Sequence, residues 1–182
     1  AHHTLLFSKD WTPDFKAVYH GPEPTRPLGA SQSIYVSKTS ATDSSVAPDG
    51  YENLFILVPV PADESYGHGD AYGAEESARV SAIANAAVAQ LGSWLGIEDL
   101  EGRVVVKRTL GPSDFAEQHN SWSGGAVGPA HTLRQSAFFR GRNVSRKLPN
   151  LYYAGGTTVP GVGVPMCLIS AQNVLTRMRE QR

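Results

Sequence analysis

Short apolar runs separated by polar, proline-containing segments characterise the first third of the chain. They predict three strands, at residues 3–7, 33–36 and 54–60. The third run is continuously apolar, which predicts burial on both of its faces, and the first is expected to be buried as well. Asp49-Gly50, before the third run, is a turn signal of the kind that joins antiparallel strands. Pro59 and Pro61 cannot donate a backbone hydrogen bond, so the far end of this strand is expected to lie at an edge or to leave the sheet.

A helical period dominates the middle of the chain. Apolar residues at spacings of three and four share one face of a predicted helix over residues 74–95, and Gly96 is a suitable C-terminal stop. These residues are Val80, Ile83, Ala84, Ala87, Leu91, Trp94 and Leu95. The other expected elements are a loop at residues 12–29 with one helical turn at 14–18, strands at 103–110 and 151–154, and helices at 112–118 and 165–178. This order predicts an α+β fold with a mainly antiparallel sheet, packed helices and a C-terminal strand–helix unit.

Composition narrows the classes of function. The 182 residues are 41% hydrophobic, which is enough for a folded core. The net charge is -1 and there is no long basic block, so nucleic acid is not expected as a partner. A single cysteine, Cys167, excludes an internal disulfide and points to a reducing compartment. No apolar run approaches the roughly 20 residues that span a bilayer, and the N-terminal segment lacks a signal-peptide pattern, so a cytoplasmic location is expected.

The most informative segment is LYYAGGTTVPGVGVPMCLISAQNVLT, residues 151–176. An apolar run leads into two pairs of glycines, and Pro165 follows at the expected first position of the last helix. The glycines are Gly155, Gly156, Gly161 and Gly163. Glycine permits positive φ and lets the backbone approach a ligand closely. The first amides and the dipole of the helix then favour an anionic ligand, and both a reduced flavin and a pyrophosphate satisfy that condition.

The dinucleotide fingerprint in this segment is incomplete. Met166 stands where a third glycine would be, and Glu180 is the only acidic residue after Ser170. The strand–helix unit is therefore not expected to bind a dinucleotide by itself, but to complete a site begun elsewhere. The alternative is a tight strand-to-helix connection whose glycines serve packing alone.

The segment AGGTTVPGVGVPMCLISAQNV resembles the C-terminal flavin signature of the phytoene desaturase branch of the flavin-dependent, amine-oxidase-like family. That branch shows a strand, Gly-x-Gly-Thr, Pro-Gly-x-Gly-aliphatic-Pro and a helix that contains Ser-Ala. Further blocks resemble the branch in the same order along the chain, at residues 2–11, 42–61, 135–143 and 148–156. Val159 stands where the family usually has histidine, which removes a proton-shuttling group from that place without affecting flavin contact.

The resemblance implies an FAD-dependent desaturase of a long-chain, phytoene-like isoprenoid polyene, as in carotenoid biosynthesis. A hydride passes from an allylic carbon to flavin N5 and a proton leaves the neighbouring carbon, by a base that is not identified. Residues 1–130 would form part of the substrate-binding domain, and residues 131–182 the C-terminal segment of the FAD-binding domain. The expected neighbours of the flavin are Gly155, Gly156, Pro160, Gly161, Gly163, Val164, Pro165 and Met166.

Residues 1–50 lack the family's fingerprint for the ADP half of FAD, so the sequence is expected to be the C-terminal part of a longer protein. Alone it is expected to be inactive, to lose FAD and to self-associate through the surface meant for the N-terminal FAD-binding half. The polyene would be drawn from a membrane by peripheral contact, along apolar strands that line or support a tunnel at residues 5–7, 34–36 and 54–60. Two alternatives stay open: a flavoprotein acting on another lipid polyene, and a non-redox module that binds an apolar ligand or a partner.

Other residues carry weaker hypotheses. A glycine-rich loop carries four side chains that could bind a metal: Asp63, Glu64, His68 and Asp70. A solvated loop without a metal is the favoured interpretation. A hydrolase site could be assembled from His131, Ser136 and Ser170, but the sequence lacks the G-x-S-x-G elbow that would support it. A basic cluster suits anionic lipid headgroups, flavin phosphate or a solvated loop, and consists of Arg134, Arg140, Arg142, Arg146 and Lys147. Cys167 is expected to be buried and inert, and the glycosylation sequon at Asn143 is interpreted as a chance match.

Overall fold

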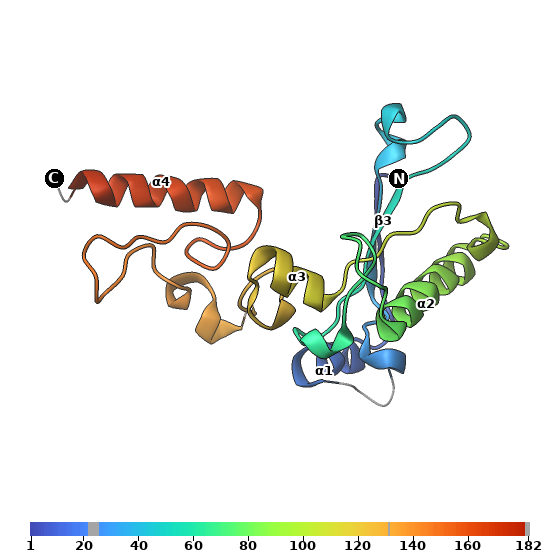
Figure 1. Ribbon diagram of the computed structural model, residues 1–182, viewed down its shortest axis with the longest axis horizontal. Helices are drawn as coiled ribbons and strands as arrows, with labels where there is room; N and C mark the ends of the chain where they lie inside the picture. Colours follow the sequence, from blue (N-terminus) through green and yellow to red (C-terminus); the bar gives the residue numbers. More distant parts are fainter. Residues whose placement is uncertain (22–25, 131, 181–182) are drawn as a thin grey trace. The chain divides into compact units, whose positions relative to one another are not determined.

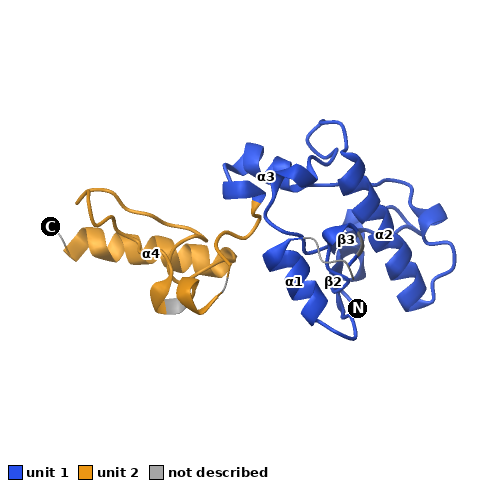
Figure 2. Cartoon of the chain, turned by 90° about the horizontal axis from the view of Figure 1, so that it is seen from below, with its two compact units in different colours: residues 1–124 blue, residues 125–182 orange. Residues whose placement is uncertain are grey.

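A computed structural model of the protein describes residues 1–21, 26–130 and 132–180. The chain forms two compact units, Ala1–Gly124 and Gly125–Arg182 (Figure 2). The described residues contain four α-helices and one three-stranded antiparallel sheet (Figure 1), which confirms the α+β class. The assignment of residues 1–130 and 131–182 to a substrate-binding and an FAD-binding domain stays a prediction.

The sheet lies in the first unit and has the strand order β1 (His3–Leu6), β2 (Ile34–Lys38), β3 (Leu54–Leu57). Both pairs are antiparallel, with Leu5 opposite Tyr35 and Tyr35 opposite Leu57. The expected turn between β2 and β3 includes Gly50 at φ 80°. β3 ends before Pro59, because a proline cannot donate to the ladder.

Helix α2 (Ala78–Leu95) covers one face of this sheet. Leu91 packs with Ile34 and Val36 in one buried apolar cluster, and a second cluster contains Tyr66 and Ile83. The side chain of Ser77 accepts a hydrogen bond from the Val80 amide at 3.4 Å. Gly96 ends the helix in the left-handed conformation, as predicted, at φ 66°. The helix begins four residues later than expected, after this Ser77 cap.

The predicted burial of the first and third strands is wrong. Alternate side chains along the strands point away from α2, and within the described residues no element covers them. The exposed apolar side chains on this open side are Leu5 (60%), Phe7 (53%), Phe55 (53%) and Leu57 (43%); Leu54 (40%), at the start of β3, points to the other face and is exposed as well. The sheet therefore presents one packed face and one open apolar face.

Two predicted strands do not form. Residues 103–110 are without strand structure, and Val105 and Val106 are exposed. Residues 151–154 contribute one antiparallel bridge, between Val144 and Tyr152. A strand needs a neighbouring ladder to satisfy its backbone groups, and an apolar run alone does not supply one.

Three further helices complete the fold. They are α1 (Thr12–His20), α3 (Pro112–His119) and α4 (Val164–Glu180). The predicted turn at residues 14–18 is thus a full helix, whereas α3 and α4 match their predictions closely. None of the helices within residues 1–21, 26–130 and 132–180 combines the length and apolarity that crossing a bilayer requires.

The buried carboxylate of Asp14 anchors α1 to the sheet region. It accepts hydrogen bonds from the Ser8 hydroxyl at 2.5 Å, the Ser33 hydroxyl at 2.6 Å and the Gln32 amide at 3.0 Å. The Arg26 guanidinium pairs with the same carboxylate at 2.5 Å. Burial alone would raise the pKa of Asp14, but these hydrogen bonds together lower the pKa to about 2.

Candidate functional site

The candidate site is the loop that enters α4 in the second unit. Gly155 and Gly163 have φ values of 118° and 113°, which side chains rarely tolerate. A Cβ atom built on either residue would meet nothing within 4 Å. The backbone at both positions therefore borders open space, and a planar or anionic ligand has access to it.

Helix α4 begins directly after Gly163. The Cys167 amide donates to the Gly163 carbonyl at 2.9 Å, so Val164 is the first helical residue and Pro165 the second. Pro165 thus stands one position later than predicted, where its missing N–H is equally harmless. The amides of Val164 and Met166 precede the first intrahelical donor and carry the positive end of the helix dipole.

A buried polar hub ties this loop to the helix. The side-chain amide of Asn143 donates to Ser170 Oγ at 2.9 Å and lies 3.1 Å from the carbonyl oxygens of Tyr153 and Val159. It also lies 3.2 Å from Thr158 Oγ1. One side chain therefore connects the end of the apolar run, the glycine loop and α4.

Ser170 is the second member of this hub and is fully buried. Its hydroxyl accepts a hydrogen bond from the Gly155 amide at 3.1 Å and lies 2.8 Å from Thr158 Oγ1. Thr158 in turn donates to the Gly155 carbonyl at 3.0 Å. These bonds fix the conformation of Gly155 from the interior and leave its other side open.

Arg140 supports the loop from behind. Its side chain is 3% exposed, and its Nε and Nη2 groups both donate to the Gly156 carbonyl. Nη1 donates to the Gln135 carbonyl at 3.4 Å. A Cβ atom on Gly161 would lie 3.9 Å from Arg140 Nε, so the guanidinium lies directly against the loop. The predicted basic cluster is thus divided, because its other members are exposed: Arg134, Arg142, Arg146 and Lys147.

All eight predicted flavin neighbours lie in this one segment. Four of those before the helix are buried or half-buried: Gly155, Gly156, Pro160 and Gly161. Gly163, Val164 and Pro165 are exposed at the helix start and Met166 is half-buried. The open glycine backbone and the free amides of the first helical turn fit an anionic ring or phosphate, although contact with a flavin stays a prediction.

The sequence-based reading missed the residues that hold the loop. Asn143 was interpreted only as a chance sequon, and its buried, hydrogen-bonded amide is not available for glycosylation. Ser170 is part of the Ser-Ala pattern of the family, and the only role suggested for it by its chemistry is in a hydrolase. Of the other members of that set, Ser136 Oγ is buried and has no hydrogen-bond partner among the described residues, and His131 lies outside them. The available signal was the presence of Asn143 and Ser170 in blocks that resemble the family.

The acidic loop at residues 63–70 does not assemble a ligand set. Asp63 accepts from the Ser65 amide at 2.9 Å, and Asp70 accepts from Arg108 at 2.8 Å. His68 Nε2 lies 2.8 Å from Glu117. Asp63, His68 and Asp70 thus each have a separate partner, and among the described residues no three ligand-type groups converge. At the start of α4, the predicted full burial of Cys167 is wrong, because this residue is half-buried.

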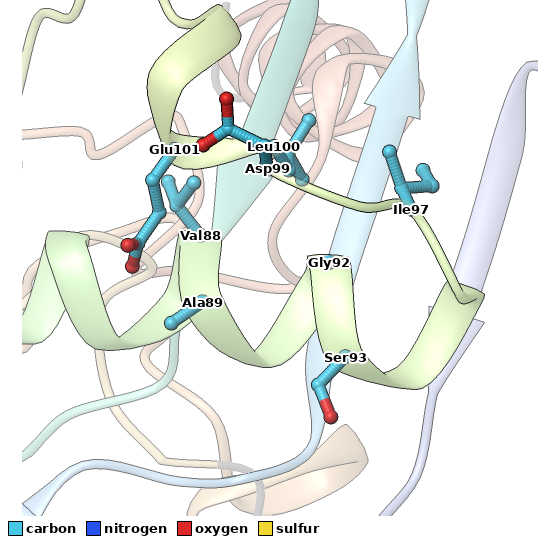
Figure 3. A pocket seen from close by; sticks show the side chains of 8 residues that line it. All are labelled: Val88, Ala89, Gly92, Ser93, Ile97, Asp99, Leu100 and Glu101. Atoms are coloured by element: carbon cyan, nitrogen blue, oxygen red, sulfur yellow. The ribbon is translucent and has the colours of Figure 1, made fainter.

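A separate cavity of about 240 Å³ lies beside α2 in the first unit (Figure 3). Its lining combines apolar side chains with two carboxylates, and consists of Val88, Ala89, Gly92, Ser93, Ile97, Asp99, Leu100 and Glu101. It contains none of the predicted site residues, and no cation lines it.

Comparison with known proteins identifies the family of the chain. The profile of the family described as flavin containing amine oxidoreductase matches residues 37–178. A carotenoid 3,4-desaturase of Haloarcula japonica is 39% identical over 180 residues, which are 98% of this chain and 33% of that protein. A 4,4'-diapophytoene desaturase (4,4'-diaponeurosporene-forming) of Staphylococcus aureus strain Newman is 31% identical over 176 residues, 97% of this chain and 34% of that protein.

The chain therefore spans about a third of the length of the curated relatives that it matches. The family resemblance read from the glycine segment is confirmed by the profile match, which covers most of the chain including the whole candidate site. This chain belongs to the flavin containing amine oxidoreductase family.

Proposed function

We propose that the chain is the C-terminal part of an FAD-dependent desaturase that acts on a long-chain isoprenoid polyene. The observation that carries the proposal is the open glycine loop before α4, found in a chain 39% identical to a carotenoid 3,4-desaturase. The two relatives have different printed activities, so neither the chain length of the polyene nor the bond that is desaturated is specified.

The loop residues would bind the cofactor and orient it. Gly155 and Gly163 let the backbone approach the ligand, and the amides of Val164 and Met166 offer donors to an anionic edge. The exposed side chains of Val164 (76%) and Leu168 (68%) would exclude water from the ring. When bound, FAD supplies an acceptor for the hydride of an allylic C–H bond, while the neighbouring carbon loses a proton and a C=C bond forms.

The open face of the sheet is the proposed wall for the polyene. A hydrocarbon offers no hydrogen bonds, so an apolar surface is its main means of recognition. Leu5, Phe55 and Leu57 present such a surface, and each is at least 43% exposed. The proposal thus gives the first unit a role in substrate binding and the second unit a role in cofactor binding.

The same division of roles predicts the partners of the chain: the N-terminal part of the longer protein, further copies of the isolated chain, and a membrane surface. Most contacts to the ADP half of FAD would come from the N-terminal part of the longer protein, so this chain alone should neither retain FAD nor be active. Its uncovered apolar side chains should make the isolated chain self-associate, which size-exclusion chromatography at increasing concentration would detect. Peripheral contact with an anionic membrane would use the exposed basic residues Arg134, Arg142, Arg146 and Lys147.

Flavin absorbance tests the proposal directly. The full-length protein that contains this chain should purify yellow, and Gly163→Trp should leave it colourless because the indole would occupy the space of the ligand. Gly73→Trp is a matched control, since Gly73 also has positive φ and open surroundings but lies outside the site. A colourless wild-type protein, or equal loss of flavin in both variants, would contradict the proposal.

A further inference from the structure

Arg140 is a buried cation that has no carboxylate partner among the described residues. Its side chain is 3% exposed, whereas charged groups in interiors are normally paired. Within the described part of the chain, no carboxylate lies within 4.0 Å of its guanidinium, although other cations have such partners. Its hydrogen bonds end on the carbonyls of Gly156 and Gln135. Carbonyl dipoles satisfy the donors but leave the full positive charge in place.

The surroundings of Arg140 direct this charge toward the glycine loop. The guanidinium is in contact with the loop through Gly156, and a Cβ atom on Gly161 would be 3.9 Å from Nε. A Cβ atom on Gly128 would be 3.8 Å from Nη2. The guanidinium therefore lies close to the backbone of three glycines, two of which, Gly156 and Gly161, belong to the loop itself.

We propose that Arg140 supplies the fixed positive charge that stabilises an anionic group of the bound flavin cofactor across the glycine loop. The inference rests on the proposed function and makes Arg140 a positioning residue that acts through the loop. The anionic group is the pyrophosphate, or the isoalloxazine ring with the negative charge that it carries when reduced. Two unit charges separated by one backbone thickness, at an effective dielectric constant of about 20, change an equilibrium constant about tenfold or more.

The test compares charge with hydrogen bonding in the full-length flavoprotein. Arg140→Gln removes the charge, Arg140→Lys keeps it, and Arg179→Gln changes an exposed arginine of the same unit. The dissociation constant of oxidised FAD and the midpoint potential of the bound flavin are measured for each variant. If Arg140→Gln does not fold, citrulline at position 140 keeps the shape and most donors and removes the charge.

Either of two results supports the proposal. If the pyrophosphate is the anionic group, Arg140→Gln binds oxidised FAD about tenfold more weakly with an unchanged potential. If the reduced ring is that group, the potential becomes about 30 mV more negative, the two-electron equivalent of tenfold. In both cases Arg140→Lys keeps the affinity and the potential close to those of the wild type, and Arg179→Gln leaves both unchanged.

Other results overturn it. An Arg140→Gln or citrulline protein with unchanged affinity and potential contradicts the role of the charge. Equal losses in the Lys and Gln variants assign Arg140 to hydrogen bonding alone and also contradict it. A wild-type protein that binds no FAD contradicts the proposed function instead, so the two failures are distinguishable.

Discussion

The two units of the chain bury different kinds of side chains. The first unit has apolar clusters under α2, in which Leu91 is 2% exposed and Ile34 3%. In the second unit the buried side chains of the described residues are polar, namely Arg140, Asn143, Thr158 and Ser170. The first unit therefore gains stability from apolar burial, and the second is ordered by hydrogen bonds that converge on a loop.

This difference indicates that the second unit needs further stabilisation. Helix α4 buries only Ser170, and its apolar side chains Leu168, Ile169 and Leu175 are exposed. A polar hub specifies conformation well but contributes little net free energy. The second unit should therefore depend for much of its stability on a bound ligand or on the remainder of the protein, by mass action.

The largest effect is expected from Asn143→Asp. The substitution places a carboxylate oxygen 2.9 to 3.2 Å from four oxygen atoms, of which the carbonyl oxygens of Tyr153 and Val159 cannot donate to it. The free energy of unfolding of the second unit should fall by about 3–5 kcal/mol, because a buried charge is left unpaired. Hydrogen exchange should show lost protection in the second unit and none lost in the first.

Asn150→Asp is the control for this substitution, because Asn150 is exposed in the same unit. Equal loss of protection in both variants would show that the hub does not hold the loop.

A smaller effect, about 2–5 kcal/mol, is expected from Leu91→Ala, which leaves a cavity in the core of the first unit. The matched change Leu168→Ala, at a side chain that is 68% exposed, should alter the stability of the 182-residue chain by less than about 0.5 kcal/mol. Urea unfolding followed separately in each unit measures both. A large loss from Leu168→Ala alone would reverse the contrast between the units.

The smallest effect is expected on the stability of the first unit at low pH, through Asp14. Because the pKa of Asp14 is about 2 in the folded protein and 3.8 as a free group, the ionised form stabilises the fold above pH 3.8. This contribution, about 2 kcal/mol, should be lost as the pH falls from 3.8 through 2. Asp14→Asn should remove this part of the pH dependence of the first unit. Parallel acid curves for the two proteins would contradict the role of Asp14.

The sequence was sufficient to predict those elements whose structure depends on residues close together in the chain. The three- and four-residue spacing of Val80, Ile83, Ala87 and Leu91 predicted α2, and Gly96 predicted its end. The strand predicted at residues 103–110 failed because a strand depends on a neighbour far away in sequence.

The site was predictable only in part for the same reason. The glycines and Pro165 are adjacent in sequence, so their pattern located the loop and the start of the helix. Asn143 meets Ser170 across 27 positions, and that contact depends on the tertiary fold. Arg140 belonged to a run of basic residues, and nothing in the run distinguished the buried member from the exposed ones.

A crystal structure of the full-length protein with bound FAD tests the central claim most directly. The isoalloxazine or ribityl part of the flavin should lie at residues 161–166, with a flavin oxygen or nitrogen about 3 Å from the amide of Val164 or Met166. A flavin that contacts no residue between 155 and 166 would contradict the assignment of this loop.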